Sequence, residues 1–348
     1  MTSLGRIFAA FTVLVAALAL AGCGGLKPGS PERAVQPLKA AVVQKMKAMG
    51  SDPHKGTLIR IFKESNELEV WKETAAGTYK LLSTYEICAW SGELGPKFVE
   101  GDRQSPEGFY TITPALMNPN SNYYLAFNTG FPNKFDRAWG RTGSNLMVHG
   151  DCSSRGCYSM TDEAIAEIYA IVRESFAGGN PSVQLQIFPF RMTPQNLARH
   201  ASSPHFSFWQ NLKEGYDRFE LARRPPVWDV CEKRYVFDVP RDGIAVLDAA
   251  GPCPAVSPAD TMVAALARKQ AADNEAMQAA IAELAAKQAQ EQAAADRKAA
   301  EEAALKARGE AIGSFVGGLL GGGKDAGVTK VVDPNLVAPR PAPRIKRG

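Results

Sequence analysis

A succession of short β-forming runs constrains the fold of this 348-residue chain more than any other feature. The runs are rich in β-branched and aromatic residues and are separated by clusters of Gly, Pro and Asn. They cover residues 57–62, 68–72, 78–87, 109–113, 123–128, 145–149 and 183–188. Short strands broken in this way predict a mainly β body of the α+β class and not a series of βαβ units.

One helix is expected within this β region. Apolar residues at 165, 168, 169 and 172 recur with helical spacing behind Thr161, which is the expected N-cap, and the Gly- and Pro-containing stretch 178–181 ends the helix. Residues 195–222 also look largely helical and stop at the Arg-Arg-Pro-Pro of 223–226. The globular part is expected to end near Pro254.

The N-terminus reads as a signal peptide. A single positive charge at Arg6 precedes an apolar run over 7–20, which is too short to span a bilayer comfortably. The following Leu-Ala-Gly-Cys of 20–23 resembles the lipobox of bacterial lipoproteins, which implies acylation of Cys23. An Asp directly after the Cys would retain the protein at the inner membrane. Because Gly24 occupies that position, we expect the protein to be anchored to the outer membrane and to face the periplasm. An ordinary secretory signal that happens to contain a Cys is the alternative.

The composition divides the chain into six parts. We expect a lipoprotein signal peptide at 1–22, a tether with a short helix at 23–56, a catalytic domain at 57–190, an extension of it at 191–257, an Ala-rich helix at 258–312 and a Gly/Pro-rich basic, disordered tail at 313–348. Residues 261–310 contain 20 Ala and no Pro, which strongly favours a helix. A solvated helix and a partner-binding or oligomerising helix both remain open, because the apolar stripe at Met277, Ile281 and Leu284 is short.

Charge argues against a nucleic-acid binder. The net charge is +4, but residues 324–348 carry six basic and two acidic side chains, which leaves 34 of each in the rest of the chain. A globular protein that neutralises phosphates needs a basic excess in its body. We therefore expect no nucleic-acid partner.

The residues with the clearest chemistry lie between His149 and Cys157. They follow an apolar run and precede the helix that begins near Thr161, so they form a strand, a turn and a helix start. A helix N-terminus together with Arg155 would favour a thiolate at Cys157, and an imidazole could take and return the thiol proton. The N–H groups of Gly156 and Cys157 could face a developing oxyanion.

Two other interpretations of these residues remain open from spacing alone. His149 could be a satisfied histidine at a strand end, with Cys152 and Cys157 buried or disulfide-bonded. His149, Cys152 and Cys157 could also be zinc ligands, although the paired C-x-x-C spacing is absent. We expect neither a metal nor a cofactor.

A family resemblance covers about residues 57–235. Ser154-Arg155-Gly156-Cys157 resembles the S-x-G-C nucleophile motif of the L,D-transpeptidase (YkuD) catalytic-domain family, and residues 147–150 (Met-Val-His-Gly) resemble its upstream histidine motif. Residues 105–110, preceded by Leu-Gly-Pro-Lys at 94–97, are similar to its T-P-x-G-x-F segment. The YafK branch, also called DpaA, is the most similar, through 149–160, 188–193, 208–209 and 213–219. The resemblance implies a YkuD-like β-sandwich or barrel core with an inserted helix.

The resemblance also implies roles for single residues. Cys157 would be the nucleophile, His149 the proton donor and acceptor, and Gly156 part of the oxyanion site. Many members have His directly before the Gly-Cys pair, where this chain has Arg155, so the base must be His149 or lie elsewhere. Ser154, Arg155 and Arg191 are candidates for substrate binding, although an Arg is as readily a solvated charge.

The implied function is acyl transfer through a Cys thioester on meso-diaminopimelate-containing bonds of peptidoglycan stem peptides. Similarity to the YafK branch favours hydrolytic release of a wall-linked envelope protein over L,D-crosslinking. The alternative is a non-catalytic lipoprotein tether that binds peptidoglycan.

Four cysteines remain once Cys23 and Cys157 have roles. Cys88, Cys152, Cys231 and Cys253 allow three full pairings, and in an oxidising compartment we favour a bond between Cys231 and Cys253. Cys152 is also a candidate neighbour of the active site, where a disulfide with Cys157 would inactivate the nucleophile.

Overall fold

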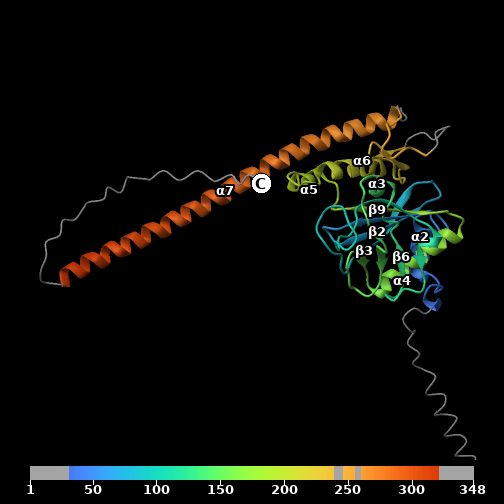
Figure 1. Cartoon of the computed structure of the whole chain (residues 1–348), viewed down its shortest axis with the longest axis horizontal. Coiled ribbons are helices and arrows are strands. Elements are labelled where there is room, and N and C mark those ends of the chain that lie inside the picture. The colour runs from blue at the N-terminus through green and yellow to red at the C-terminus, as the bar shows by residue number, and fades with distance from the viewer. Residues whose placement is uncertain (1–30, 239–245, 255–259, 321–348) are drawn as a thin grey trace, which may run out of the picture. The chain divides into compact units, whose positions relative to one another are not determined.

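The computed structural model of the protein describes residues 31–238, 246–254 and 260–320 (Figure 1). The expected signal peptide, the lipid-anchor candidate Cys23 and the end of the basic tail lie outside the described residues. The chain divides into two compact units, 1–284 and 285–348. Among the described residues, no helix is both long and apolar enough to cross a membrane.

Eleven strands and eight helical segments are found in the described residues. The strands are β1 Thr57–Phe62, β2 Glu67–Glu73, β3 Tyr79–Glu86, β4 Gly108–Ile112, β5 Met117–Asn118, β6 Ala126–Asn128, β7 Met147–His149, β8 Tyr158–Ser159, β9 Val183–Phe188, β10 Trp228–Cys231 and β11 Arg234–Phe237. The helices are η1 Pro31–Arg33, α2 Ala40–Ala48, η2 Pro114–Leu116, α3 Lys134–Ala138, α4 Asp162–Ala177, α5 Pro194–Arg199, α6 Phe206–Ala222 and α7 Asp260–Leu320. The expected class, α+β with an inserted helix and a long C-terminal helix, is confirmed.

A five-stranded sheet in the order β3-β2-β1-β9-β4 forms the centre of the first unit. Strand β1 is parallel to β9, and the other pairs are antiparallel. Side chains alternate along β1 as a strand requires: Ile59 and Ile61 join one buried cluster, and Phe62 joins another. The sheet is therefore covered on both faces.

The smaller sheet shares the first of these clusters. Its order is β5-β6-β7-β8, and Val148 of β7 and Tyr158 of β8 pack in the same cluster as Ile59 and as Ile168 of α4. Both sheets and α4 thus enclose one core, which fixes β7 and β8 against rigid neighbours. The second cluster lies on the opposite side and includes side chains of α6 and of the β10–β11 hairpin.

The local signals for α4 are confirmed. The Thr161 side chain accepts a hydrogen bond from the Ala164 N–H at 3.1 Å, and Gly178 is the C-cap. Acidic residues occupy the first turn, where the helix dipole favours negative charge. The expected helix over 195–222 is instead two helices, α5 and α6, because residues 200–205 do not continue the helix.

Two expected boundaries differ from the structure. The short helix expected within 23–56 is present as α2, but it is not part of a tether, because its Val42 and Met46 are buried in the core of the first unit. Helix α7 ends at Leu320 and not before Gly313, so the start of the expected tail is helical. A helix that has already formed upstream needs no new nucleation to continue. Each Gly that it then includes costs only about 1 kcal/mol of helix stability relative to Ala.

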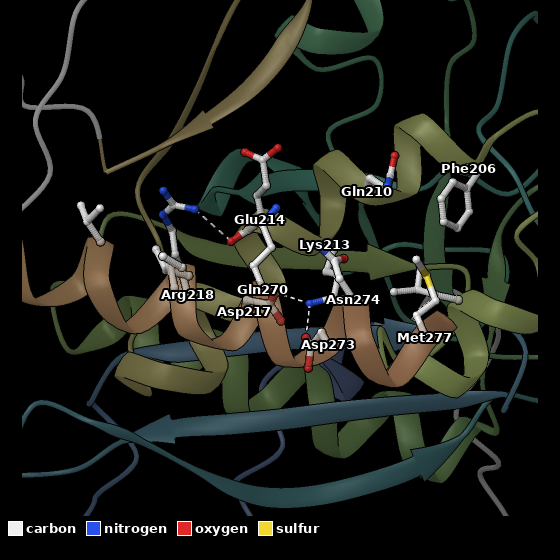
Figure 2. A pocket seen from close by; sticks show the side chains of 14 residues that line it. Phe206, Gln210, Lys213, Glu214, Asp217, Arg218, Gln270, Asp273, Asn274 and Met277 are labelled. Carbon is white, nitrogen blue, oxygen red and sulfur yellow. Dashed lines mark hydrogen bonds and ion pairs between the residues drawn. The ribbon is translucent and has the colours of Figure 1, made fainter. Parts of the chain in front are cut away.

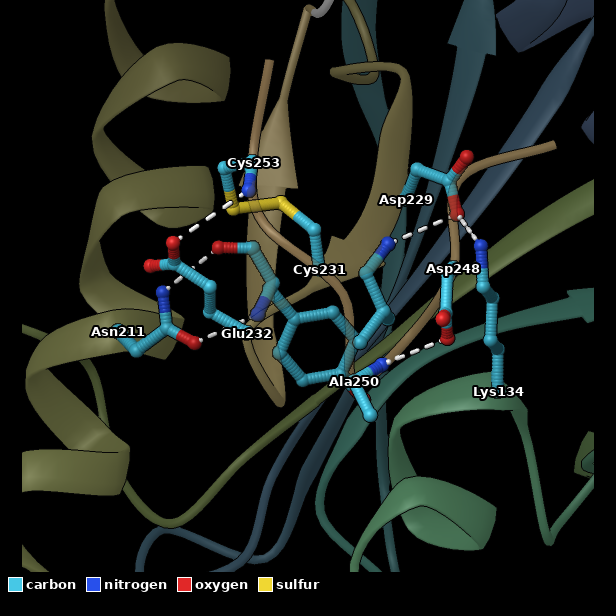
Figure 3. Close-up of a disulfide and its surroundings, with 10 residues drawn as sticks. Lys134, Asn211, Asp229, Cys231, Glu232, Asp248, Ala250 and Cys253 are labelled. Atoms are coloured by element: carbon cyan, nitrogen blue, oxygen red, sulfur yellow. Dashed lines mark hydrogen bonds and ion pairs between the residues drawn. A yellow bond between two sulfur atoms is a disulfide. The ribbon is translucent and has the colours of Figure 1, made fainter. Parts of the chain in front are cut away.

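A disulfide between Cys231 and Cys253 attaches residues 246–254 to the β10–β11 hairpin (Figure 3). Backbone hydrogen bonds from the Glu232 and Lys233 N–H groups, each 2.8 Å long, reinforce this attachment. The pairing is the one favoured from the sequence. Asn211 of α6 bonds the hairpin backbone at Tyr235 in both directions, at 2.9 Å.

Candidate active site

Two neighbouring parallel strands bring His149 and Cys157 to the same region. In the β7–β8 register Val148 pairs with Tyr158 and His149 with Ser159, so Cys157 lies level with Met147. Residues two apart on a strand point to the same side, and they are about 7 Å apart. His149 and Cys157 therefore lie on one side of the sheet, opposite to the buried Val148 and Tyr158. The connection of residues 150–157 is short for a parallel pair, which usually needs a dozen residues or more.

The Cys157 thiol is free and held by the backbone. Its Sγ accepts a hydrogen bond from the Met147 N–H at 3.4 Å and donates to the Asn145 carbonyl oxygen at 3.6 Å. Burial raises the pKa of the Cys157 thiol, against smaller lowering effects of the Met147 N–H and the charge of Lys97. The resting form is therefore the neutral thiol, and a base must take its proton for attack.

His149 has the properties of that base. Its Nδ1 lies 2.5 Å from the Gly150 carbonyl oxygen, and because a carbonyl only accepts, Nδ1 carries the proton and Nε2 keeps its lone pair. The ring packs against Tyr123 with 4.7 Å between centroids. Burial lowers the pKa of His149, partly offset by the Gly150 carbonyl and by Asp151. The imidazole is thus neutral near pH 7 and able to accept a proton.

Two serine hydroxyls fix the backbone of the nucleophile. The Cys157 carbonyl oxygen accepts hydrogen bonds from Ser154 Oγ at 2.7 Å and from Ser105 Oγ at 3.2 Å. In the next residue, the Tyr158 hydroxyl donates to the Pro106 carbonyl oxygen at 2.7 Å. The segment that begins at Ser105 therefore positions β8, a role that sequence reasoning did not assign to it.

Gly156 and Arg155 differ in how firmly they are held. Gly156 has φ +126°, a conformation that favours glycine, and a Cβ there would meet the Leu146 side chain at 3.3 Å. Its N–H already bonds Ser154 Oγ at 3.3 Å, so it must exchange that weak bond to serve an oxyanion. Arg155 is solvent exposed and pairs with no acidic side chain in the described residues.

Lys97 is a charge near the thiol that sequence reasoning missed. Its buried ammonium bonds Asp102 and the Val99 carbonyl oxygen, the latter at 2.9 Å. Gly143 leaves the space it needs, since a Cβ there would lie 2.6 Å from Lys97 Cε. A positive charge at this place favours the thiolate in the transition state. The Leu-Gly-Pro-Lys stretch of 94–97, which precedes the T-P-x-G-x-F-like segment, was the feature of the sequence that could have pointed to Lys97.

A fully buried ion pair between Lys63 and Glu107 holds the segment that contains Lys97 and Ser105. Lys63 Nζ lies 3.0 Å from Glu107 Oε1 and also bonds the Ser105 carbonyl oxygen at 3.1 Å. Glu107 accepts further bonds from the Gly95 N–H at 2.7 Å and from Trp209 Nε1 at 2.8 Å. Burial lowers the pKa of Lys63, and Glu107 opposes that change. These bonds join the 93–107 segment to both β1 and α6.

Cys152 is bonded to Cys88 and not to Cys157. The zinc interpretation of His149, Cys152 and Cys157 is therefore excluded for this state, because a disulfide sulfur cannot act as a thiolate ligand. The bond holds the short loop after β7 to the chain that follows β3. In that loop Asp151 and Cys152 both have positive φ, of 70° and 35°.

The other substrate-binding candidates are engaged elsewhere. Arg191 makes ion pairs of 2.7 Å with Glu67 and with Glu69 on β2, and its guanidinium stacks over Phe62. No contact links it to the Cys157 loop among the described residues. The Ser154 hydroxyl donates its hydrogen bond to the Cys157 carbonyl oxygen.

A cavity of about 450 Å³ between α6 and the first turns of α7 is a separate feature (Figure 2). Three of its charged lining residues pair with one another, since Lys213 contacts both Asp217 and Asp273. No residue of the 145–157 region lines it. This cavity is therefore separate from the candidate site at Cys157.

Comparison with known proteins gives the family. A family model described as the L,D-transpeptidase catalytic domain, YkuD, matches residues 56–184. The chain is also 47% identical over 196 residues to the YafK protein of Escherichia coli K12 and to that of strain O157:H7, which covers 56% of this chain and 78% of each relative. The chain belongs to the L,D-transpeptidase (YkuD) family.

Similarity to solved structures is weaker. The helical cell shape determining protein Pgp2 of Campylobacter jejuni aligns with a TM-score of 0.31 and 22% identity, over 42% of this chain and 54% of that chain. The aligned part is thus about half the length of that protein. Residues 149 and 157 both fall within the family match, whereas Arg191 and the β10–β11 hairpin lie beyond it.

Proposed function

We propose that this L,D-transpeptidase-family protein transfers acyl groups through a thioester at Cys157, acting on meso-diaminopimelate-containing bonds of peptidoglycan. The observation that carries the proposal is the placement of a free, backbone-held thiol directly before β8 and of a neutral imidazole, whose Nδ1 proton is fixed, at the end of the adjacent parallel strand β7. Family membership supplies the reaction class, and similarity to YafK supplies the branch.

The first half-reaction forms the thioester. His149 Nε2 takes the Cys157 thiol proton, and the sulfur attacks the carbonyl carbon of the scissile peptide bond. Backbone N–H groups at Gly156 and Cys157 would stabilise the oxyanion, and Lys97 would offset the negative charge on sulfur. The C–N bond then breaks, and His149 returns its proton to the leaving amine.

The second half-reaction decides the outcome. Water, or an amine, attacks the thioester carbonyl while His149 takes a proton from it, and the C–S bond breaks to restore the thiol. We propose water as the preferred acceptor, which would release a wall-linked envelope protein, because the motifs are most similar to those of the YafK branch. Amine transfer would form an L,D-crosslink through the same thioester.

We also propose that the protein is lipid-anchored through Cys23, on the periplasmic side of the outer membrane. The support is the lipobox-like sequence of residues 20–23 and Gly24 after it. Such an anchor would hold the enzyme at the surface where envelope proteins meet the wall. The competing function, a non-catalytic tether on peptidoglycan, needs the same anchor but no nucleophile.

Sacculi that carry a covalently attached protein test these alternatives. The purified chain is incubated with them, and the products are resolved by mass. Hydrolysis yields free protein and stems that end in unmodified diaminopimelate, whereas transfer yields diaminopimelate-to-diaminopimelate crosslinks. No product from the wild-type chain, with wall binding equal in Cys157→Ala, would support the tether and refute the enzyme.

A further inference from the structure

A second cavity, of about 300 Å³, is lined by the two residues that flank Lys97 in the chain. Pro96 and Phe98 line it, and Lys97 between them is the residue whose charge acts on Cys157. The 96–98 segment therefore contributes both to the lining of the cavity and to the charge that acts on the thiol.

Two aromatic side chains at the cavity are open to solvent. Phe98 is 49% exposed and Trp139 is 56% exposed, although large apolar side chains normally bury their rings. Trp139 is fixed by a 2.9 Å hydrogen bond from its Nε1 to the Lys233 carbonyl oxygen, so its ring is held in place. Fixed, exposed aromatic faces mark binding surfaces.

A buried cation, Arg141, is among the residues that line the cavity. Arg141 is only 8% exposed, and its guanidinium lies 5.0 to 5.6 Å from the ring centres of Phe98, Phe135 and Phe208. Its Nη1 bonds Asp136 at 2.9 Å, but its Nε has no hydrogen-bond partner in the described residues. The guanidinium nevertheless brings a positive charge to the cavity lining, which a ligand carboxylate would offset.

The rim of the cavity is basic. Lys233 and Arg234 line it beside Arg141, and no Asp or Glu occurs among its described lining residues. Arg234 pairs with Glu214, whereas Lys233 has no acidic partner in the described part of the chain and lies over the Trp139 ring. The cavity is thus matched to a ligand that combines a ring face with an anionic group.

We propose that this cavity is a subsite for the sugar-proximal part of peptidoglycan, which rests on the function proposed above. A pyranose ring has a face of C–H groups that packs on Trp139 and Phe98, and a stem-peptide carboxylate would pair with Arg141 and Lys233. The subsite would hold the glycan end of the substrate while the stem reaches Cys157. It makes the enzyme selective for muropeptides over free stem peptides.

Binding is measured by calorimetry on the full chain carrying Cys157→Ala, which prevents turnover. The probes are a disaccharide-tetrapeptide, the same tetrapeptide without sugars, and a chito-oligosaccharide that has rings but no carboxylate. We expect the disaccharide-tetrapeptide to bind about tenfold more tightly than the tetrapeptide. Equal affinities for these two probes would overturn the proposal.

Added substitutions locate the effect. Trp139→Ala and, separately, Phe98→Ala should reduce the sugar-dependent advantage, whereas Lys233→Met should weaken the disaccharide-tetrapeptide and leave the chito-oligosaccharide unchanged. Val99→Ala is the matched control, because Val99 is exposed, follows Phe98 and does not line the cavity. Circular dichroism checks that each variant is folded. If the disaccharide-tetrapeptide still binds more tightly than the tetrapeptide by the wild-type factor in both aromatic variants, the assignment is overturned.

Turnover separates this inference from the proposed function. If the active chain processes both peptide probes with equal kcat/KM and Trp139→Ala changes neither, the subsite is wrong and the acyl transfer stands. If neither probe is processed but the sugar-dependent affinity is found, the acyl transfer is wrong and the subsite stands.

Discussion

The hydroxyl of Ser105 donates a hydrogen bond to the carbonyl oxygen of Cys157 across 52 positions of sequence, at 3.2 Å. Ser105 also accepts from the Ser91 N–H at 3.2 Å, so its side chain joins two loops to the residue that carries the thiol. Its position in the chain is the one where the T-P-x-G-x-F segment of the family has Thr.

Ser105→Ala should therefore lower kcat by about three- to tenfold, because one hydrogen bond of about 1 kcal/mol no longer positions Cys157. Ser105→Thr keeps the hydroxyl and should restore most of the rate. Ser153→Ala is the control, because Ser153 is an exposed serine in the 150–157 connection that leads to Cys157. Steady-state turnover with a muropeptide substrate measures the effect, and equal rates for Ala and Thr at position 105 would contradict it.

His149 and Cys157 should behave as one catalytic unit. Cys157→Ala, His149→Ala and the double variant should each lose at least about a thousandfold in kcat, without additivity. Arg155→Ala should cause a smaller loss of kcat, because the Arg155 side chain is exposed and makes no hydrogen bond or ion pair with the described residues. Full activity of Cys157→Ala in the sacculus assay would refute the site assignment.

The acid limb of the pH profile should reflect His149. Catalysis needs the neutral imidazole, and because burial lowers the pKa of His149 below 6.5, kcat/KM should reach half its maximum below pH 6.5. Asp151 raises that pKa, so Asp151→Asn should move the limb to still lower pH. A half-maximum above pH 6.5 in the wild-type chain would exclude His149 as the base with this protonation state.

The two disulfides should have different effects on activity. Loops of 64 and 22 residues predict stability losses of about 4 and about 3 kcal/mol for removal of Cys88–Cys152 and Cys231–Cys253. Cys88→Ser with Cys152→Ser should also lower kcat, because the loop between His149 and Cys157 is released. Cys231→Ser with Cys253→Ser, the control, should lower the Tm alone. Thermal unfolding and turnover below both Tm values test this, and equal losses of kcat would count against it.

Membrane attachment should depend on Cys23. Cys23→Ala should move the protein from the membrane fraction to the soluble fraction, since several acyl chains give secure anchoring and none gives little. Activity of the released chain on muropeptides should persist. Unchanged partitioning after cell fractionation would argue for another means of attachment.

Local signals predicted the parts of the fold that depend on neighbouring residues. The N-cap at Thr161 and strands β1 and β9 were found because capping and alternation lie within short windows. Strands β6 and β7 are shorter than the predicted 123–128 and 145–149. Tyr124 and Asn145 have φ of 68° and 55°, which interrupts an extended chain.

The missed features depend on tertiary contacts or on unusual turns. The β10–β11 hairpin turns at Glu232 and Lys233, both with positive φ. Turns of this kind usually contain Asn-Gly, and without that pair the sequence gives no signal for the hairpin. The charge of Lys97 near Cys157 arises from a loop about 60 positions earlier in the chain. The Cys157 and His149 pair was found because both lie in one continuous motif.

The short connection between β7 and β8 leaves no room for changes of length. Losing or gaining one residue between His149 and Cys157 would shift β8 by one position against β7, and successive residues of a strand point to opposite sides. The sulfur of Cys157 would then turn into the core, and the phenol of Tyr158 would turn out of it. Sequence drift at these positions can replace side chains, but insertions and deletions there would destroy the enzyme in a single step.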